Sequence, residues 1–292
     1  MPLFRRCFEE AQIPLSDYSF ANNVVWQSHR RLLYTVVEGC VCLLSLRGGV
    51  LSMWLPPLGP DDRAVEAMDA CIALMIEHNA PTAGFEIACV HEGLLEAFYG
   101  ATAWRDAYAV IANPPDYLYS TSELIELRGN AYKSKRNDIN QLLRAHADVR
   151  LDALGPEHQG EVAELCELWL AQRRIDEGSL DELALEESHA ILYAVDHMDA
   201  LGLTGLRLLV DGRTEAFILG ERLLPDVGHV LFEKSNRDRR GAAQLIFREY
   251  CRTLGGCARI NTGDALGSDG LARNKESYRP LALGRKFTIC SR

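Results

Sequence analysis

The sequence has 292 residues, of which 48% are hydrophobic, so it can form two domains with a core in each. Acidic residues (41) outnumber basic ones (31) and the formal net charge is −10, which argues against a general nucleic-acid-binding protein because such proteins are usually basic. The chain shows no signal-peptide pattern and no stretch of ~20 apolar residues that would span a bilayer. The nine scattered cysteines lack a zinc spacing, which predicts reduced thiols, no metal site and a cytoplasmic location.

The first part of the sequence has the alternation of a mixed α/β domain. Its predicted strands are residues 32–37, 41–46, 50–55 and 84–90, with a helix at 61–78. Pro114 and Pro115 then fit neither a central strand nor a helix interior. We therefore expect an N-terminal domain at 1–113 and a C-terminal domain at 114–292.

The remainder predicts helices and strands in a characteristic order. The predicted strands are 117–119, 149–151, 206–210, 214–220, 229–234, 258–261 and 281–289, and the predicted helices are 128–146, 162–169, 181–197, 241–254 and 269–277. Asp211-Gly212 is a hairpin signal, and Ser120 and Glu123 have the spacing of a capping box that starts a further helix. This order resembles the GNAT acyltransferase fold. The similar, shorter alternation in the first part predicts a mixed α/β protein with two GNAT-like acyltransferase domains in tandem.

One candidate segment is a strand, a loop and a helix start from residue 229 to 244. The strand period of two would place His229 and Glu233 on one face, as a base and its orienting acid; an ordinary exposed edge strand is the alternative. The loop and the helix N-terminus favour phosphate or RNA contact, unless they form only a solvated basic turn. The candidate ligands in this loop are Arg237, Arg239, Arg240 and Gly241. Asp238 stands where a GNAT pyrophosphate loop has Arg or Gln.

A second candidate segment is the Gly-rich loop and helix after the strand at 258–261. Ligand sites of α/β proteins often lie in loops at the carboxyl ends of strands. Here Asp264 would hold an ammonium group, Lys275 would bind a carboxylate or a developing oxyanion, and Tyr278 would donate a proton. The alternative is a turn followed by a surface helix whose charges are three residues apart.

A third segment is basic although the chain as a whole is acidic. Its five cations are Arg128, Lys133, Lys135, Arg136 and Arg144, which lie within about five helical turns. Such a face suits a polyanion; the alternative is a solvated face with Asp138 as partner. No Gly-x-Ser-x-Gly, Gly-x-Gly-x-x-Gly or Walker loop occurs.

Together, these segments resemble the C-terminal catalytic domain of phosphatidylglycerol lysyltransferase and its soluble stand-alone relatives. The matching residues are Gly129, Tyr132, Lys135, Arg136 and Asn137 in one block, His229, Glu233, Lys234 and Gly241 in the next, and Asn261, Asp264, Gly270, Leu271, Lys275, Tyr278 and Pro280 in the last. In the last block the glycine after Asp264 comes three residues later, at Gly267. The resemblance implies a tandem GNAT fold.

The resemblance also implies transfer of an aminoacyl group from aminoacyl-tRNA to an acceptor, with no tightly bound cofactor. The acceptor would be an amine or hydroxyl of a small molecule, a peptide or a lipid headgroup. Asp264 would hold the aminoacyl ammonium, Lys275 would stabilise the oxyanion, and His229 or Glu233 would move protons. The remaining implied substrate contacts are Asn261, Lys133, Lys135, Arg136, Asn137, Arg237, Arg239, Arg240 and Gly241.

Two other functions remain open. Gly241 and Ala243 fit part of a CoA-binding loop, which leaves acyl-CoA as the alternative co-substrate for an N-acyltransferase. Asp238 and the acidic surface leave a non-catalytic binding protein on the same fold.

Overall fold

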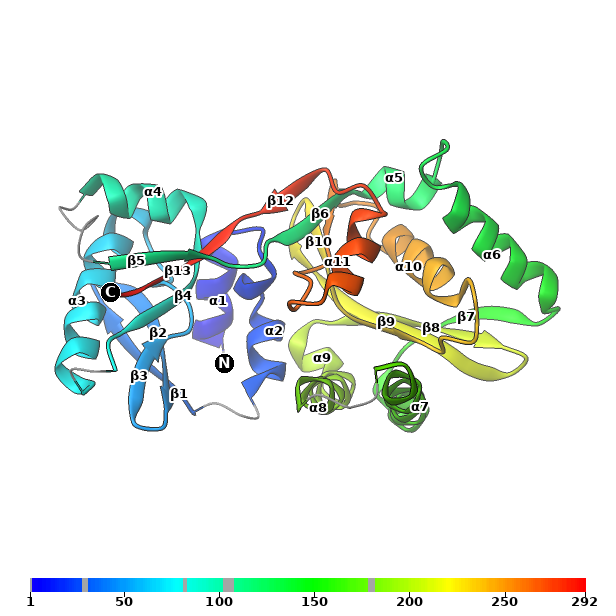
Figure 1. The fold of residues 1–292 in the computed structure, drawn as a ribbon, viewed down its shortest axis with the longest axis horizontal. Coiled ribbons are helices and arrows are strands. Elements are labelled where there is room, and N and C mark those ends of the chain that lie inside the picture. Colours follow the sequence, from blue (N-terminus) through cyan, green and yellow to red (C-terminus); the bar gives the residue numbers. More distant parts are fainter. Residues whose placement is uncertain (1, 28–30, 81–82, 102–107, 178–181) are drawn as a thin grey trace.

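Two β-sheets lie next to each other along the long axis of the molecule (Figure 1). The computed structural model describes residues 2–27, 31–80, 83–101, 108–177 and 182–292. In this part of the chain, the first sheet has six strands in the order β1-β2-β3-β4-β13-β5, and the second has seven in the order β12-β6-β11-β10-β9-β8-β7. None of the helices described is both long and apolar enough to cross a membrane.

The first sheet is built from strands near both ends of the chain. Its strands are β1 (Arg31–Val37), β2 (Cys40–Arg47), β3 (Val50–Met53), β4 (Glu86–His91), β5 (Tyr108–Ala112) and β13 (Lys286–Ser291). One face is covered by α3 (Asp61–His78) and α4 (Glu92–Ala101). The other face packs on α1 (Pro2–Ala11), the short helix η1 (Ser16–Tyr18) and α2 (Phe20–Val25).

The second sheet has helices on both faces. Its strands are β6 (Asp116–Ser120), β7 (Val149–Ala153), β8 (Thr204–Val210), β9 (Arg213–Leu224), β10 (Val227–Ser235), β11 (Arg259–Asn261) and β12 (Ala282–Gly284). One face is covered by α5 (Thr121–Glu126), α6 (Lys133–Ala145) and α10 (Ala242–Thr253). The other is covered by α7 (Gln159–Glu177), α8 (Glu182–Asp196) and α9 (Met198–Leu201), preceded by η4 (Pro156–His158), whereas α11 (Asp269–Glu276) follows β11.

The C-terminal segment differs from the single final strand that the sequence predicts at 281–289, and that prediction is wrong. It forms two strands in different sheets, because β12 pairs with β6 and β13 lies between β4 and β5. Asn113 N–H donates to the Lys286 carbonyl at 3.0 Å where the two connections run next to each other. The chain thus leaves the first sheet after β5 and returns to it at β13 (Figure 1).

A shared hydrophobic core joins the two sheets. It combines Val41 and Leu43 of β2 with Phe217 and Leu219 of β9, and the helices α1, α2, α7 and α8 fill the space between them. A separate core lies under α3 and α4, and another under α6 and α10. One of the three cores therefore contains side chains from both sheets.

Local turn chemistry follows the sequence at one predicted site and departs from it at another. Asp211 and Gly212 have φ of 51° and 79° and join β8 to β9, as the hairpin signal predicts. Ser120 precedes α5, but its side chain makes no capping hydrogen bond and instead contacts the Ser122 hydroxyl at 3.0 Å. The predicted capping box is therefore wrong, although the helix begins at the predicted position.

We expect Gly241→Ala to destabilise the protein by about 2–4 kcal/mol, combining left-handed strain with overpacking. Gly241 has φ of +94°, and an added Cβ would lie 2.2 Å from the Asp138 carbonyl oxygen of α6. Urea unfolding measures the change. Gly212→Ala is the matched control because Gly212 also has positive φ, +79°, but no atom within 4 Å of an added Cβ. Equal losses in the two variants would contradict the close approach of α6.

Candidate functional site

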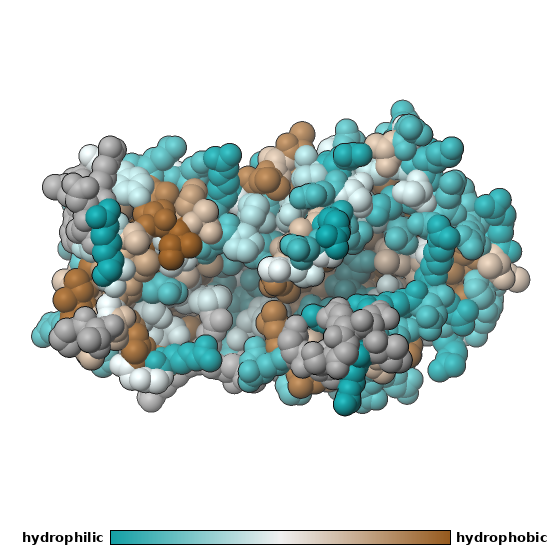
Figure 2. Space-filling view, viewed as in Figure 1, coloured by the Kyte–Doolittle hydropathy of each residue, from teal (hydrophilic) through white to brown (hydrophobic). Residues whose placement is uncertain are grey.

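A pocket of about 770 Å³ opens where β10 and β11 diverge. The two strands pair only from Val227 to His229, after which β10 continues to Ser235 and the chain after Asn261 turns away. The space between them is lined by α7, α8, β10, α10, the loop after β11 and α11, and the surface is recessed there (Figure 2). Strand divergence therefore creates the pocket.

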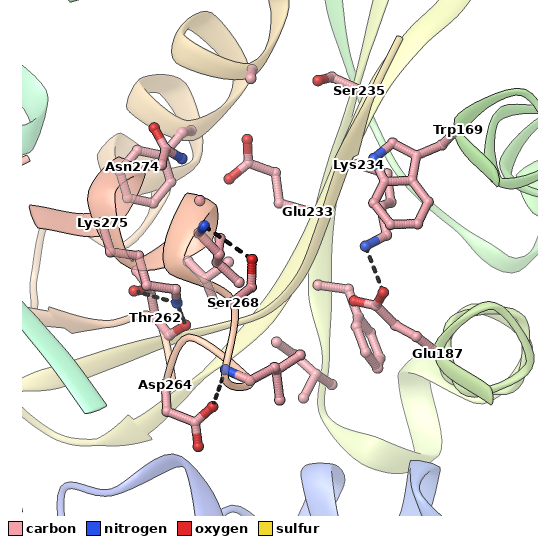
Figure 3. A pocket seen from close by; sticks show the side chains of 18 of the residues that line it. Trp169, Glu187, Glu233, Lys234, Ser235, Thr262, Asp264, Ser268, Asn274 and Lys275 are labelled. Atoms are coloured by element: carbon pink, nitrogen blue, oxygen red, sulfur yellow. Dashed lines mark hydrogen bonds and ion pairs between the residues drawn. The ribbon is translucent and has the colours of Figure 1, made fainter. Parts of the chain in front are cut away.

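A β-bulge in β10 separates the two residues that strand periodicity places together. The register with β9 shifts between Val230 and Phe232, which leaves Leu231 as an extra residue. His229 consequently faces Glu221 of β9, with Nδ1 3.3 Å from Oε1, and is only 2% exposed. Glu233 lies on the opposite face and points toward α11 (Figure 3). The predicted common face of His229 and Glu233 is wrong, and His229 does not line the pocket.

Glu233 of β10 and Lys275 of α11 both line the pocket, and both have strongly shifted pKa values. Burial raises the pKa of the Glu233 carboxyl to about 7, although the charges of Lys275, Lys234 and Lys135 act in the opposite direction. Burial lowers the pKa of the Lys275 ammonium to about 8, against the opposing influence of Asp116, Asp264 and Glu233. Both groups therefore titrate near neutral pH, which is characteristic of residues that exchange protons in catalysis.

The ammonium of Lys275 is held by neutral oxygens of the loop after β11. It donates to the Thr262 carbonyl, to Thr262 Oγ1 at 3.1 Å and to the Gly263 carbonyl at 3.2 Å. The Tyr119 hydroxyl fixes the end of α11 by donating to the Lys275 carbonyl at 2.9 Å. Since these hydrogen-bond acceptors carry no formal charge, the positive field of Lys275 remains available to negative charge in the pocket.

Asp264 lines the pocket and also belongs to a buried ionic cluster. Its Oδ2 lies 3.0 Å from Nζ of Lys286. Its Oδ1 accepts from Leu266 N–H at 2.8 Å on the pocket side (Figure 3). Lys286 also pairs with Asp17 and Asp116. Asn261, a predicted substrate ligand, instead donates to Asp116 Oδ2 and the Pro14 carbonyl and is fully buried outside the pocket.

The basic segment is divided by burial, because Lys135 and Arg136 turn into the protein behind the site whereas Arg128, Lys133 and Arg144 are exposed. Lys135 is 8% exposed, with Nζ 4.1 Å from the Tyr278 ring centroid, and burial lowers its pKa. Arg136 donates to the carbonyls of Leu127 and Gly129, which end α5. Lys133 and Asn137, the other two predicted contacts of this segment, are exposed. None of the four predicted contacts, Lys133, Lys135, Arg136 and Asn137, lines the pocket.

Tyr278, which follows α11, contacts residues of the basic segment around α6. Its carbonyl accepts from the Tyr132 hydroxyl at 2.9 Å, and its ring packs edge-on to Phe247 of α10. Burial raises the pKa of its phenol well above the ordinary value, with Glu233 acting in the same direction. Tyr278 lines the pocket as a neutral hydroxyl.

Two of the three loop arginines are engaged by carboxylates. Arg239 pairs with the buried Glu215 at 3.0 Å, and Arg240 pairs with Asp138 of α6 at 2.8 Å. Gly241 lies against α6, so of the four predicted loop ligands only Arg237 lines the pocket. The α10 residues that face the pocket are Ala243, Gln244 and Phe247.

The sequence reasoning missed the pocket wall on the α7 and α8 side. Trp169 of α7 and Glu187 of α8 flank Lys234, whose Nζ lies 3.9 Å from the indole centroid and 2.7 Å from Glu187 Oε2 (Figure 3). Trp169 belongs to an apolar helical stripe and Glu187 to a helix rich in Glu, so neither is distinctive alone. Lys234 within the His…Glu-Lys block and Arg237 of the following loop are the signals in the sequence that point to this wall.

Comparison with known proteins places the chain in a family. The model of the family "Phosphatidylglycerol lysyltransferase, C-terminal" matches residues 9–290. A conserved protein of unknown function from Bacteroides thetaiotaomicron has a similar structure, with a TM-score of 0.87 and 24% identity, covering 100% of this chain and 96% of that one. A search of curated proteins finds no significant match.

Two further solved structures are similar in fold. L-PGS from Bacillus licheniformis has a TM-score of 0.67 and 12% identity and covers 100% of this chain and 91% of its own. A tandem GNAT protein from the clavulanic acid biosynthesis pathway has a TM-score of 0.54 and 14% identity, covering 99% and 93%. These similarities confirm the predicted mixed α/β tandem GNAT-like fold. Given the family match over residues 9–290, the chain belongs to the family of phosphatidylglycerol lysyltransferase C-terminal domains.

Proposed function

We propose that the protein is an acyltransferase that moves an aminoacyl group from aminoacyl-tRNA to an acceptor amine or hydroxyl in the pocket between β10 and α11. The observation that carries this proposal is the pair Glu233 of β10 and Lys275 of α11, which line the same pocket and have pKa values of about 7 and about 8. The family and the fold support an acyltransferase. The aminoacyl-tRNA donor and the acceptor class are what the resemblance to the lysyltransferase family implies.

The proposed reaction uses Glu233 as the proton acceptor. The acceptor N–H or O–H attacks the ester carbonyl, and its proton passes to the Glu233 carboxylate as the new bond forms. The field of Lys275 stabilises the oxyanion of the tetrahedral intermediate. Collapse breaks the ester bond, and the ribose hydroxyl leaves with the proton that Glu233 returns. Atoms and charges balance without a metal or a redox cofactor.

Asp264 is proposed to bind the aminoacyl ammonium. One of its oxygens pairs with Lys286 and the other accepts from Leu266 N–H. A carboxylate has about four lone-pair positions, so these two contacts leave room for a further donor on the pocket side. His229, which is paired with Glu221 outside the pocket, has no step in this mechanism.

Acyl-CoA is the second candidate donor. The observation that favours it is the start of α10, where Ala243 and Gln244 line the pocket close to a helix N-terminus that attracts phosphate. CoA at about 100 times its dissociation constant would stabilise the fold by ~2.7 kcal/mol. Thermal stabilisation by CoA, with no effect of tRNA, would support this donor.

The proposed reaction is tested with radiolabelled aminoacyl-tRNA and a broad pool of amines, peptides and polar lipids. We expect the wild-type protein to release label from tRNA faster than spontaneous hydrolysis and to transfer it to one class of acceptor. Release at the spontaneous rate with every acceptor and every aminoacyl group would overturn the aminoacyl-tRNA proposal.

The rate of transfer is expected to have a narrow pH optimum. Glu233 must be deprotonated to accept a proton, so kcat/KM rises through a pKa of about 7. Lys275 must stay charged to stabilise the oxyanion, so kcat/KM falls through a pKa of about 8. The rate is measured from moderately acidic to moderately alkaline pH with correction for ester hydrolysis. A flat profile across this range would contradict both assignments.

A further inference from the structure

The pocket reaches both faces of β10 along the edge that β11 leaves open. Glu233 and Lys234 are consecutive residues of this strand, so their side chains point to opposite faces of the sheet. Figure 3 shows Glu233 turned toward α11, and Lys234 turned toward Trp169 and Glu187. All four residues line the pocket. The pocket therefore has one side next to α11 and another next to α7 and α8.

The side next to α7 and α8 carries an ion pair between Lys234 and Glu187. Lys234 Nζ lies 2.7 Å from Glu187 Oε2, and the two side chains are only 9% and 16% exposed. The same Nζ lies 3.9 Å from the ring centroid of Trp169, and the aromatic face stabilises its charge. A ligand on this side of the pocket therefore meets an ammonium and a carboxylate as direct neighbours.

Both members of the ion pair keep hydrogen-bonding capacity. An ammonium has three donors, and a carboxylate accepts at about four positions. Within the ranges of the chain that the structure describes, the hydrogen bond between Lys234 and Glu187 is the only one that either charged group makes. Buried polar groups normally have their hydrogen bonds satisfied. The spare donors of Lys234 and the spare lone pairs of Glu187 therefore favour a polar ligand.

The ion pair favours a ligand group that is neutral and has a donor next to an acceptor. A cationic group would be repelled by Lys234, and an anionic group would be repelled by Glu187. A primary carboxamide avoids both conflicts, because its oxygen accepts from the ammonium while its N–H donates to the carboxylate. Its oxygen and nitrogen are about 2.2 Å apart on one carbon, close to the 2.7 Å between the paired atoms. A trans peptide fits less well, because its N–H and C=O point in opposite directions.

The positions of the reacting groups assign this side of the pocket to the acceptor. In the proposed function the aminoacyl group uses Asp264 in the loop after β11 and Lys275 of α11. The acceptor, whose N–H must reach Glu233, then has the side next to α7 and α8. We propose that Lys234 and Glu187 select an amine acceptor that carries a primary carboxamide. This inference rests on the proposed function, because that reaction defines which side holds the donor.

The carboxamide takes no part in the bond changes. The acceptor amine attacks the ester carbonyl and forms the new amide bond, its proton passes to Glu233, and the ribose hydroxyl leaves with that proton. Lys234 and Glu187 act only by binding and orienting the acceptor. They are therefore specificity-determining residues, and their effect should appear in the choice of acceptor.

Binding of three isosteric molecules tests the subsite without an acyl donor. The probes are propionamide, propionate and propylammonium, and each dissociation constant is measured by saturation-transfer NMR titration at neutral pH. We expect wild type to bind propionamide about 10-fold more tightly than either charged probe, the usual effect of a hydrogen bond to a charged group. Glu187→Gln should shift the preference toward propionate, because the charge of Lys234 is then unmatched. Lys234→Met should shift it toward propylammonium.

The matched controls break an ion pair of the same length outside the pocket. Arg259 and Asp226 are also 2.7 Å apart, and neither of them lines the pocket. Asp226→Asn and Arg259→Met should keep the wild-type preference for propionamide. Urea unfolding shows which variants are folded, and if Lys234→Met is not, the shift in Glu187→Gln decides.

A transfer assay then tests the assignment to the acceptor. The acceptors are glycinamide and β-alaninamide, each compared with the carboxylate and the diamine of the same length. We expect wild type to transfer label from aminoacyl-tRNA to at least one amide with a kcat/KM about 10-fold higher than to its charged isosteres. Glu187→Gln should lower this ratio by favouring the carboxylate, whereas a purely structural role would lower all three rates equally.

The outcomes separate this inference from the proposed function. No binding of any probe to wild type, no preference for propionamide, or a preference that both pocket variants leave unchanged overturns the subsite. An equal shift in the two control variants overturns it as well. A carboxamide preference in binding but not in transfer overturns the assignment to the acceptor. If no molecule receives label, the proposed aminoacyl transfer fails, while a preference for propionamide that depends on Lys234 and Glu187 still supports a carboxamide subsite.

Discussion

Replacing Glu233 by glutamine is expected to lower the transfer rate by about 10²–10⁴-fold, the usual contribution of a positioned proton acceptor. Glutamine keeps the size of the side chain and its place between α10 and α11 but cannot take up a proton. The rate is measured as label transferred from aminoacyl-tRNA in single-turnover conditions, so that product release does not hide the effect. Wild-type rates in the variant would exclude Glu233 as the proton acceptor.

The same substitution is expected to stabilise the fold above neutral pH. The pKa of Glu233 is raised from 4.5 to about 7 in the folded protein, so its favourable contribution is complete below pH 4.5 and is lost as the pH rises through 7. Glutamine stays uncharged and avoids this loss. We expect a gain of about 1–3 kcal/mol at about pH 8 and little change at about pH 4.5, measured by urea unfolding.

Glu276→Gln is the matched control for both effects. Glu276 is an exposed residue of α11, and it does not line the pocket. Its substitution should leave the transfer rate unchanged and the stability within about 0.5 kcal/mol. A loss of activity in Glu233→Gln together with a loss of stability at alkaline pH would indicate a structural role for Glu233 instead of a proton-transfer role.

Much of the pocket could be predicted because its residues follow a buried strand or start a helix. The sequence predicts Glu233, Asp264, Lys275 and Tyr278 as site residues, and all four line the pocket. Their positions depend on local order along the chain, namely a strand, a Gly-rich loop and a short helix. Local patterns of this kind are visible in a single sequence.

The directions in which the side chains of β10 and α6 point could not be predicted in the same way. An extra residue at Leu231 reverses the faces of β10, and no residue type in that segment marks a bulge. Lys135 and Arg136 turn inward because Tyr278 and the end of α5 lie behind α6, which only the packed structure reveals. Long basic side chains can bury their stems while their charges find partners, so a basic stretch does not by itself identify a surface.

Lys286→Met is expected to destabilise the protein by about 3–5 kcal/mol at neutral pH, because it leaves buried carboxylates without their cation. Nζ of Lys286 lies 2.5 Å from Asp17 Oδ2, 3.0 Å from Asp264 Oδ2 and 3.1 Å from Asp116 Oδ1, and Lys286 is 3% exposed. Burial lowers the pKa of Lys286, but the three carboxylates outweigh it and raise the pKa above the ordinary value. Chemical unfolding of the variant measures the loss.

The loss of stability caused by Lys286→Met should become smaller as the pH falls. Burial alone raises the pKa of Asp116, but Lys286 and the hydrogen bonds from Ser16 and Asn261 outweigh burial and hold it below the ordinary value. The stabilising contribution of ionised Asp116 is present at neutral pH and is lost as the pH falls through the pKa of Asp116 in the folded protein. Without Lys286 the carboxyls protonate more easily and become neutral, so the difference between variant and wild type should be smaller in mild acid than at neutral pH.

Arg285→Ala is the control that distinguishes the effect of breaking the buried ionic cluster from the effect of removing any positive charge. Arg285 is the neighbouring residue, but its side chain is 67% exposed and pairs with Glu92 at 3.3 Å, so its removal should cost less than about 1 kcal/mol. Adding Asp116→Asn to Lys286→Met should recover part of the stability, because one buried charge is removed. Equal, small losses in the Arg285 and Lys286 variants would contradict a buried ionic cluster.

Lys286 links the first sheet to an aspartate that lines the pocket. Lys286 starts β13 of the first sheet, Asp17 lies between α1 and α2, Asp116 starts β6 of the second sheet, and Asp264 lines the pocket. The crossing of the C-terminal chain into the first sheet therefore holds an aspartate of the loop after β11 through Lys286. Loss of stability and loss of substrate ammonium binding should occur together in Lys286→Met, whereas Glu233→Gln should separate activity from stability.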